Sequence, residues 1–290
     1  MNGAWLEPRL DKVKIFDATW FLPPAHGPRN ADAEFLERRI PGAMRFDLDA
    51  LADPNEKDLP HMLPPLDWFG AKMDQIGVSP NDPIVVYDAI GQFSAARAFW
   101  TLYVLGAKDV KMLDGGLPLW IAEKRRLESG PVKIQPKANA PGTWVSNASP
   151  RLDQVIKMAK VEQFAQTNLS GRPQANLQLV DARPKNRFLG IDPEPRPGLK
   201  KGKIPGSVSV PVKDVLNADG TFKSRKELEK VFSDAGIDVS GRSTVMTSCG
   251  SGTTAAILSF ALKELLGVNA PLYDGSFAEW GKLNADRPVQ

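Results

Sequence analysis

Short apolar runs alternate along the chain with longer stretches of helical character. The segment 243–248 is such a short run and predicts a buried strand. The segment 253–266, rich in Ala, Ile, Leu and Phe, predicts a helix, and Gly267 stands where a helix C-cap belongs. Strands that alternate with helices in this way predict a parallel sheet covered by helices on both faces.

The motifs of this pattern occur twice. An Ile-Pro-Gly motif follows a strand-like run at 40–42 and again at 204–206. Matching residues are separated by 164 positions early in the copies, as in Asp17 and Asp181, and the separation is 160 later, as in Trp120 and Trp280. A shared offset across separate motifs is hard to obtain by chance. The chain therefore reads as two copies of one α/β domain.

The copies divide the chain into three segments. Residues 1–127 form the first domain and residues 151–290 the second. The stretch 128–150 between them is rich in Pro, Asn, Gly and Ser, has weak periodicity, and is interpreted as a linker.

Composition narrows the function classes. The formal net charge is only +3, which gives no electrostatic reason to expect nucleic-acid binding. No apolar run reaches the roughly 18 residues of a membrane span, and the N-terminus does not resemble a secretory signal. We expect a cytoplasmic protein. A mitochondrial location is the alternative if a targeting segment is absent from this chain.

The chain has one cysteine, Cys249, which excludes internal disulfides and a cysteine-rich zinc site. It lies between the predicted strand and helix of the second copy, at the sheet edge where α/β proteins bind ligands. The residues around it predict a cradle of inward-facing N–H groups, to which the helix N-terminus adds partial positive charge. These cradle residues are Gly250, Gly252, Thr253 and Thr254. Such a cradle would stabilise a Cys249 thiolate and make it nucleophilic.

Two comparisons sharpen this prediction. Protein tyrosine phosphatases carry an arginine six positions after the cysteine to clamp phosphate, and here that position is Ala255. In the first copy Ala89 stands opposite Cys249. One domain is therefore predicted to perform the chemistry and the other to support it.

The chain resembles the rhodanese superfamily and, within it, the tandem-domain 3-mercaptopyruvate sulfurtransferases. The resemblance spans nearly the whole chain and includes both Ile-Pro-Gly motifs, the segment His-Met-Leu-Pro at 61–64 and the loop Cys-Gly-Ser-Gly-Thr-Thr-Ala at 249–255. That family typically has Val at the position of Thr253. Thiosulfate-preferring rhodaneses instead carry basic residues directly after the cysteine, where this chain has Gly250 and Ser251.

The resemblance also implies site residues. Arg187 and Arg196 would bind the carboxylate and keto oxygen of the substrate, because guanidinium donates two hydrogen bonds in a fixed fork. Ser251, His61 and Asp49 would form a proton relay, with Asp47 as the alternative to Asp49.

The resemblance implies a sulfurtransferase. Sulfur would move from 3-mercaptopyruvate to a persulfide on Cys249 and then to a thiol acceptor such as thioredoxin, or to cyanide, with release of pyruvate. We expect no metal, organic cofactor, nucleic acid or membrane partner. The alternatives are a thiosulfate sulfurtransferase and a noncatalytic rhodanese-like sulfur-relay adaptor.

Overall fold

The computed structural model describes residues 1–23, 26–132 and 137–290. Its residues cluster into two compact units. The first comprises Met1–Asn55, Leu63–Leu152 and Ala218–Thr221, and the second comprises Glu56–Met62, Asp153–Asn217 and Phe222–Gln290. Each unit contains one parallel sheet, so the predicted repeat of an α/β domain is confirmed.

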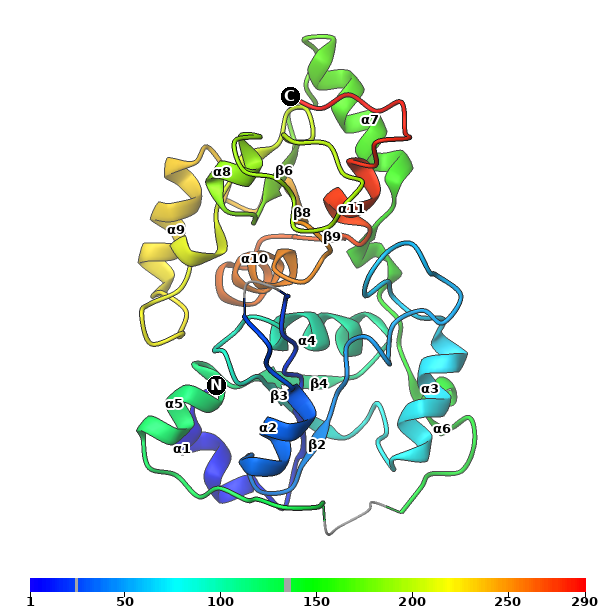
Figure 1. Cartoon of the computed structure of the whole chain (residues 1–290), viewed down its shortest axis with the longest axis vertical. Coiled ribbons are helices and arrows are strands. Elements are labelled where there is room, and N and C mark those ends of the chain that lie inside the picture. Colours follow the sequence, from blue (N-terminus) through cyan, green and yellow to red (C-terminus); the bar gives the residue numbers. More distant parts are fainter. Residues whose placement is uncertain (24–25, 133–136) are drawn as a thin grey trace. The chain divides into compact units, whose positions relative to one another are not determined.

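The first sheet has the strand order β2-β1-β3-β4, with every pair parallel. Its strands are β1 (Lys14–Asp17), β2 (Ala43–Arg45), β3 (Pro83–Tyr87) and β4 (Asp109–Met112). The helical elements of this part of the chain are α1 (Gly3–Leu6), η1 (Glu7–Arg9), α2 (Ala31–Glu37), α3 (Leu66–Gln75), α4 (Ala95–Val104), α5 (Gly116–Ala122) and α6 (Thr143–Asn147) (Figure 1).

The second sheet repeats this order and adds one edge strand, giving β5-β9-β8-β6-β7, again all parallel. Its strands are β5 (Val155–Ile156), β6 (Leu177–Asp181), β7 (Val208–Ser209), β8 (Thr244–Ser248) and β9 (Leu272–Tyr273). The helical elements are η2 (Leu152–Gln154), α7 (Met158–Leu169), α8 (Lys185–Phe188), η3 (Val212–Asp214), α9 (Arg225–Asp234), α10 (Ala255–Phe260), η4 (Ala261–Leu266) and α11 (Ser276–Trp280).

The second unit shows why this sequence forms a two-faced sheet. Leu179 of β6 and Met246 of β8 are fully buried in a cluster with residues of α7 and α11. Their neighbours Val180 and Val245 are equally buried and point to the other face, because side chains alternate along a strand. Helix α10 contacts β8. Both faces are therefore covered, as the apolar runs predicted.

The helix predicted at 253–266 forms in two parts. It is α-helical over α10 and continues as the π-helical segment η4. Gly267 ends it in the left-handed conformation, with φ of 79°, as its position predicted.

Part of the stretch 128–150 packs as a helix within the first unit. Trp144 of α6 is fully buried. Its backbone N–H donates to Asp74 at 3.0 Å and its indole N–H donates to the carbonyl of Leu105 at 3.0 Å. These bonds join the segment around Trp144 to the end of α3 and to the residue that follows α4.

In each sheet, the connections that follow two neighbouring central strands run to opposite sides. The chain leaves β6 for β7 on one side and later forms β8 on the other side of β6. The carboxyl ends of β6 and β8 therefore flank a topological switch point, where open α/β sheets bind ligands. In the first unit β1 and β3 occupy the same places.

Candidate active site

The backbone of Cys249 is held by α11. Cys249 directly follows β8 and is 2% exposed. Its N–H donates to the Oγ of Ser276 at 3.2 Å, and its carbonyl accepts from the N–H of Phe277 at 3.0 Å. Ser276 itself has a φ of 49° and donates to the carbonyl of Tyr273 at 2.9 Å. A positive φ at a serine is uncommon, and here it lets one hydroxyl bridge the two loops.

The loop after Cys249 presents unused donors. In the part of the chain that the structure describes, the backbone N–H groups from Gly250 to Thr253 donate to no protein acceptor. Gly252 adopts a φ of 78°, which suits glycine and lets the loop turn back on itself. The carbonyl of Gly250 is fixed by the N–H of Ala278 at 2.8 Å. The loop is thus anchored from outside, and its N–H groups are left for a bound anion.

The corresponding loop of the first unit has the opposite arrangement. Asp88 is fully buried, and its carboxylate accepts four hydrogen bonds from the backbone of its own loop. Oδ1 accepts from Ile90 at 2.9 Å and Gly91 at 2.7 Å, while Oδ2 accepts from Ser94 and Ala95 at 2.8 Å each. An internal carboxylate therefore occupies the place of a ligand in this copy.

Ser248 stands where the first copy has Asp88. Its hydroxyl is buried and forms no hydrogen bond within residues 1–23, 26–132 and 137–290. A neutral hydroxyl cannot supply the four acceptor positions of a carboxylate. The second cradle therefore stays open beside the only thiol of the protein.

Arg187, predicted as a substrate ligand, lies against this loop. A Cβ atom added to Gly250 would be 3.0 Å from Nη2 of Arg187, so a larger residue at this position would press on the guanidinium. The same Nη2 donates to Oε2 of Glu194 at 2.7 Å. Glu194 is buried, with 3% of its side chain exposed, whereas 17% of Arg187 remains exposed. The carboxylate of Glu194 therefore fixes the orientation of the Arg187 guanidinium, while part of the Arg187 side chain remains exposed to solvent.

Buried Arg183 links Glu194 to a second carboxylate, Asp181. Arg183 donates from Nη1 to Oε1 of Glu194 at 2.7 Å and from Nη2 to Oδ2 of Asp181 at 2.7 Å. Its guanidinium also lies over the ring of Phe277 at 3.9 Å. Burial alone would lower the pKa of Arg183, but Asp181 and Glu194 outweigh it and raise that pKa above its ordinary value. This network ties Arg187 to the end of β6.

Arg183 and Glu194 are not among the site residues predicted from the sequence. Both carried a signal that could have been used. Arg183 follows Asp181 by two residues at the end of a predicted strand, and Glu194 lies within the proposed substrate segment between Arg187 and Arg196. Charged residues in such places are candidates for a buried network, but the pairing itself is not visible in the sequence.

Arg196 lines a separate cavity of about 460 Å³. Asp58 and Lys282 lie on its wall and form an ion pair at 3.7 Å. Ala278, whose N–H fixes the cysteine loop, lines the same cavity. Arg187 therefore lies against Gly250, whereas Arg196 shares a cavity with Ala278.

The residues of the predicted relay fall into different compact units. His61 is 4% exposed, has a φ of 59°, and belongs to the segment Glu56–Met62 that clusters with the unit of Cys249 and Ser251. Asp49 belongs to the first unit, where its carboxylate accepts from the indole N–H of Trp20 at 2.8 Å. Asp47 accepts from the N–H of Asp49 at 2.9 Å. The choice of partner for His61 stays a prediction from the resemblance.

Ser251 is buried and follows Cys249 by two residues in the sequence. Its Oγ lies 3.4 Å from Oγ1 of Thr253, so the two hydroxyls share a hydrogen bond across the cradle. Ser251 is 6% and Thr253 is 3% exposed. The hydroxyl that the family resemblance assigns to proton relay is therefore held inside the loop.

Two kinds of site are absent from the residues that the structure describes. No group of three or more His, Cys, Asp or Glu among them could hold a metal ion. None of the helices they form has the length and apolar character needed to cross a membrane.

Known proteins resemble this chain over its full length. The model of the Rhodanese-like domain matches residues 4–123 and again residues 165–283. The 3-mercaptopyruvate sulfurtransferase of Escherichia coli (strain K12) is 38% identical, with 100% of this chain and 97% of that protein covered. The 3-mercaptopyruvate sulfurtransferase of Homo sapiens is 36% identical, with 92% of this chain and 84% of that protein covered.

Solved structures agree with these relatives. SseA from Escherichia coli, described as a 3-mercaptopyruvate sulfotransferase with the rhodanese fold, has a TM-score of 0.78 at 34% identity and covers 95% of this chain and 97% of its own. Tum1 from Saccharomyces cerevisiae has a TM-score of 0.80 at 30% identity, covering 93% and 88%. The chain therefore belongs to the rhodanese family and, within it, to the tandem-domain 3-mercaptopyruvate sulfurtransferases.

Proposed function

We propose that this enzyme transfers sulfur from 3-mercaptopyruvate through a persulfide on Cys249. The thiolate attacks the sulfur of the substrate and forms the S–S bond. The carbon–sulfur bond breaks, and its electron pair leaves on carbon as the enolate of pyruvate. Protonation of that carbon gives pyruvate, and the outer sulfur remains on Cys249 for an acceptor.

The open N–H array beside Cys249 is the observation that carries this proposal. Donors already fixed in place stabilise an anion without reorganisation, and they act strongly in a site that excludes water. The groups from Gly250 to Thr253 would hold the negative charge of the thiolate and then of the persulfide. Asp88 in the first unit supports this role, because its carboxylate accepts from Ile90 and Gly91, the residues that match Gly250 and Ser251.

Arg187 would bind the substrate carboxylate. Its partly exposed guanidinium lies over Gly250, and Glu194 fixes its orientation. Arg196, on the wall of the cavity beyond Ala278, would bind from another side and contact the keto oxygen. Two guanidinium groups at different angles suit a planar 2-oxo acid, whose carboxylate and keto oxygens lie in one plane.

Ser251 and His61 would deliver the proton that converts the enolate to pyruvate. A histidine titrates near neutrality, so it can deliver a proton through a hydroxyl. Both residues belong to the compact unit that contains Cys249. His61→Ala should therefore act mainly on kcat, because proton delivery matters as the transition state forms.

The loop also bears on the choice between sulfur donors. Thiosulfate is a dianion and favours positive charge after the nucleophile, where this chain has Gly250 and Ser251. A longer side chain at position 250 would also displace Arg187. We therefore propose that 3-mercaptopyruvate is the preferred donor.

The acceptor and the compartment belong to the same proposal. A persulfide is discharged by attack of a thiolate on its outer sulfur, so a small thiol or a thioredoxin-type dithiol would serve as acceptor. A lone reactive cysteine is best preserved in a reducing compartment, which favours the cytoplasm.

Substitution of the nucleophile tests the proposal. The wild type, treated with 3-mercaptopyruvate alone, should gain one sulfur atom on Cys249 by mass spectrometry, and Cys249→Ser should gain none and lose turnover. The ratio of kcat/KM for 3-mercaptopyruvate to that for thiosulfate, with one acceptor, should exceed one. Turnover by Cys249→Ser would overturn the proposed nucleophile, because the chain has no second cysteine.

A further inference from the structure

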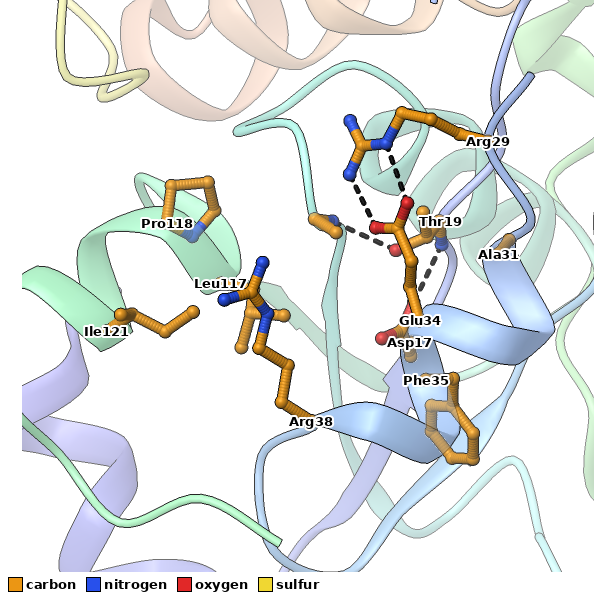
Figure 2. Close-up of a pocket in the computed structure, with 11 residues that line it drawn as sticks. Asp17, Thr19, Arg29, Ala31, Glu34, Phe35, Arg38, Leu117, Pro118 and Ile121 are labelled. Atoms are coloured by element: carbon orange, nitrogen blue, oxygen red, sulfur yellow. Dashed lines mark hydrogen bonds and ion pairs between the residues drawn. The ribbon is translucent and has the colours of Figure 1, made fainter. Parts of the chain in front are cut away.

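The first unit contains a cavity of about 260 Å³ beside Ala89, the position that matches the nucleophile. Helix α2 and helix α5 form two of its walls, and Asp17 lies at its base (Figure 2). A water molecule takes about 30 Å³ in the liquid, so the space suits a molecule of a few carbon atoms. The cavity thus lies at the switch point of a sheet whose own loop has lost the thiol.

The cavity is open because two of its lining residues are smaller than the residues that match them in the second copy. Thr19 and Leu117 line the cavity. With the offsets of the repeat, they match Arg183 and Phe277, whose guanidinium and ring pack on each other at 3.9 Å. The first copy therefore has a hydroxyl and a leucine where the second has a large stacked pair.

Most charges on the cavity wall are already neutralised. Arg29 binds both carboxylate oxygens of Glu34, at 2.7 and 2.5 Å. This hydrogen bonding raises the pKa of Arg29. Asp17 accepts from the N–H of Thr19 at 2.9 Å and faces Arg45 at 3.4 Å. Burial raises the pKa of Asp17, while the hydrogen bond from Thr19 and the charge of Arg45 favour its ionised form.

Arg38 is the one charged residue of the cavity wall, among the described residues, that has no charged partner. Its side chain forms no hydrogen bond or ion pair within the residues that the structure describes, and it lines the cavity. Figure 2 shows its guanidinium with Pro118 and Ile121 of α5 on one side and Glu34 on the other. A free guanidinium at the mouth of a small cavity attracts an anion and can hold a carboxylate by two parallel hydrogen bonds.

The remaining wall is apolar. Leu117, Pro118 and Ile121 of α5 face Arg38 across the opening. A compact inorganic anion would use the guanidinium and leave this wall uncovered. A short carbon chain would bury it, which contributes about 25 cal/mol for each Å² removed from water.

We propose that this cavity is a second, noncatalytic site that binds short-chain monocarboxylates. The carboxylate contacts Arg38, and the carbon chain lies on Leu117, Pro118 and Ile121. No sulfur transfer takes place there, because Ala89 offers no nucleophile and Asp88 already occupies the loop donors. Pyruvate belongs to the same chemical class, so the site can sense a 2-oxo acid.

Methyl NMR of the full chain tests the site without relying on catalysis. Isoleucine methyl groups are labelled, the Ile121 signal is assigned with Ile121→Val, and butyrate, pyruvate and sulfate are titrated at constant ionic strength. Butyrate and pyruvate should shift the Ile121 signal to saturation. Arg38→Ala should weaken both at least tenfold, because a charge-assisted contact is lost.

Two variants serve as controls for charge and for space. Arg126→Ala removes an exposed arginine of the first unit that does not line the cavity, and it should leave binding unchanged. Leu117→Phe restores the ring of the second copy and should weaken binding by narrowing the space. The proposal is overturned if the Ile121 signal does not saturate, if sulfate binds as tightly as butyrate, or if Arg38→Ala binds as the wild type does.

Discussion

The loops that follow β3 and β8 share one fold and differ in what occupies their backbone donors. After β3, the carboxylate of Asp88 accepts four N–H groups of its own loop. After β8, Ser248 offers a hydroxyl without a partner in the described chain, and the donors from Gly250 to Thr253 stay open. Backbone donors after β3 therefore stabilise the protein in one copy, whereas those after β8 are available to a ligand in the other.

The difference shows how an active site gives up stability. Hydrogen bonds to a charged group are each worth about 1.5–3 kcal/mol, and the first loop has four of them. The second loop leaves this stabilisation unrealised until an anion forms there. Functional sites in proteins commonly leave hydrogen-bonding groups without partners. In this chain the first copy shows the corresponding loop with its backbone donors satisfied.

Placing a carboxylate in the second loop is the strongest test of this comparison. Ser248→Asp should fill the open donors as Asp88 does and lower kcat/KM by about 10²- to 10³-fold, the range found when anion-stabilising donors are lost. Persulfide formation on Cys249 should fail in the same proportion, as followed by mass spectrometry. Ser248→Asn has nearly the same volume without the charge, so an equal loss in that variant would attribute the effect to size.

Removing the carboxylate from the first loop should reduce stability. Asp88→Asn can keep only one oxygen acceptor, and its amide group faces N–H donors. We expect a loss of about 3 kcal/mol in the free energy of unfolding, because buried donors lose their partners. Thermal melting measures this loss, and Ser248→Asn should change Tm much less. Equal changes in both variants would contradict the assignment of Asp88 as the stabilising group.

The second loop also depends on a guanidinium aimed from α8. Arg187→Ala should lower kcat/KM for 3-mercaptopyruvate by about 10²-fold, chiefly through KM, because a charged substrate contact of about 2–3 kcal/mol is lost. Glu194→Gln should have a smaller effect of the same kind, since Arg187 stays but is less well fixed. Arg172→Ala, an exposed arginine of the same unit, provides the control. A loss confined to kcat would show that Arg187 does not bind the ground-state substrate.

The smallest expected effect concerns Asp17, at the end of β1. Burial raises the pKa of Asp17 above its ordinary 3.8, so the folded state binds this proton more tightly than the unfolded state does. The ionised carboxylate is therefore destabilising above that raised pKa, and the penalty disappears below pH 3.8. Asp17→Asn should raise Tm at neutral pH, and the gain should shrink as pH falls towards 3.8. Asp11→Asn, at an exposed position, should show no such pH-dependent gain.

Much of the fold could be predicted because its signals are local. The buried strand β8 and the helix after it follow from apolar runs at 243–248 and 253–266, and Gly267 marks the helix end because its backbone adopts positive φ. The offsets shared by several motifs, 164 early in the copies and 160 later, predicted two copies of one domain with a parallel sheet. The change from α10 to η4 could not be predicted, since a π-helical segment has the same apolar pattern as an α-helix.

The site was predicted in part for the same reason. Cys249 and its glycines form one continuous motif, so the nucleophile loop could be found in the sequence. Arg183 and Glu194 were missed because their importance lies in a buried pairing that also involves Asp181. Charged residues occur throughout the sequence, and only the contacts among these three side chains distinguish them.

By itself, the sequence determined that the protein is a tandem rhodanese with one thiol, because repeats, periodic apolar positions and a contiguous loop motif are properties of the chain's order. The tertiary structure decided which loop donors are used and which are free. It showed Asp88 occupying the first cradle and Ser248 leaving the second open. The physical reason is that hydrogen bonds depend on distance and angle between groups in space, and the residue letters record neither.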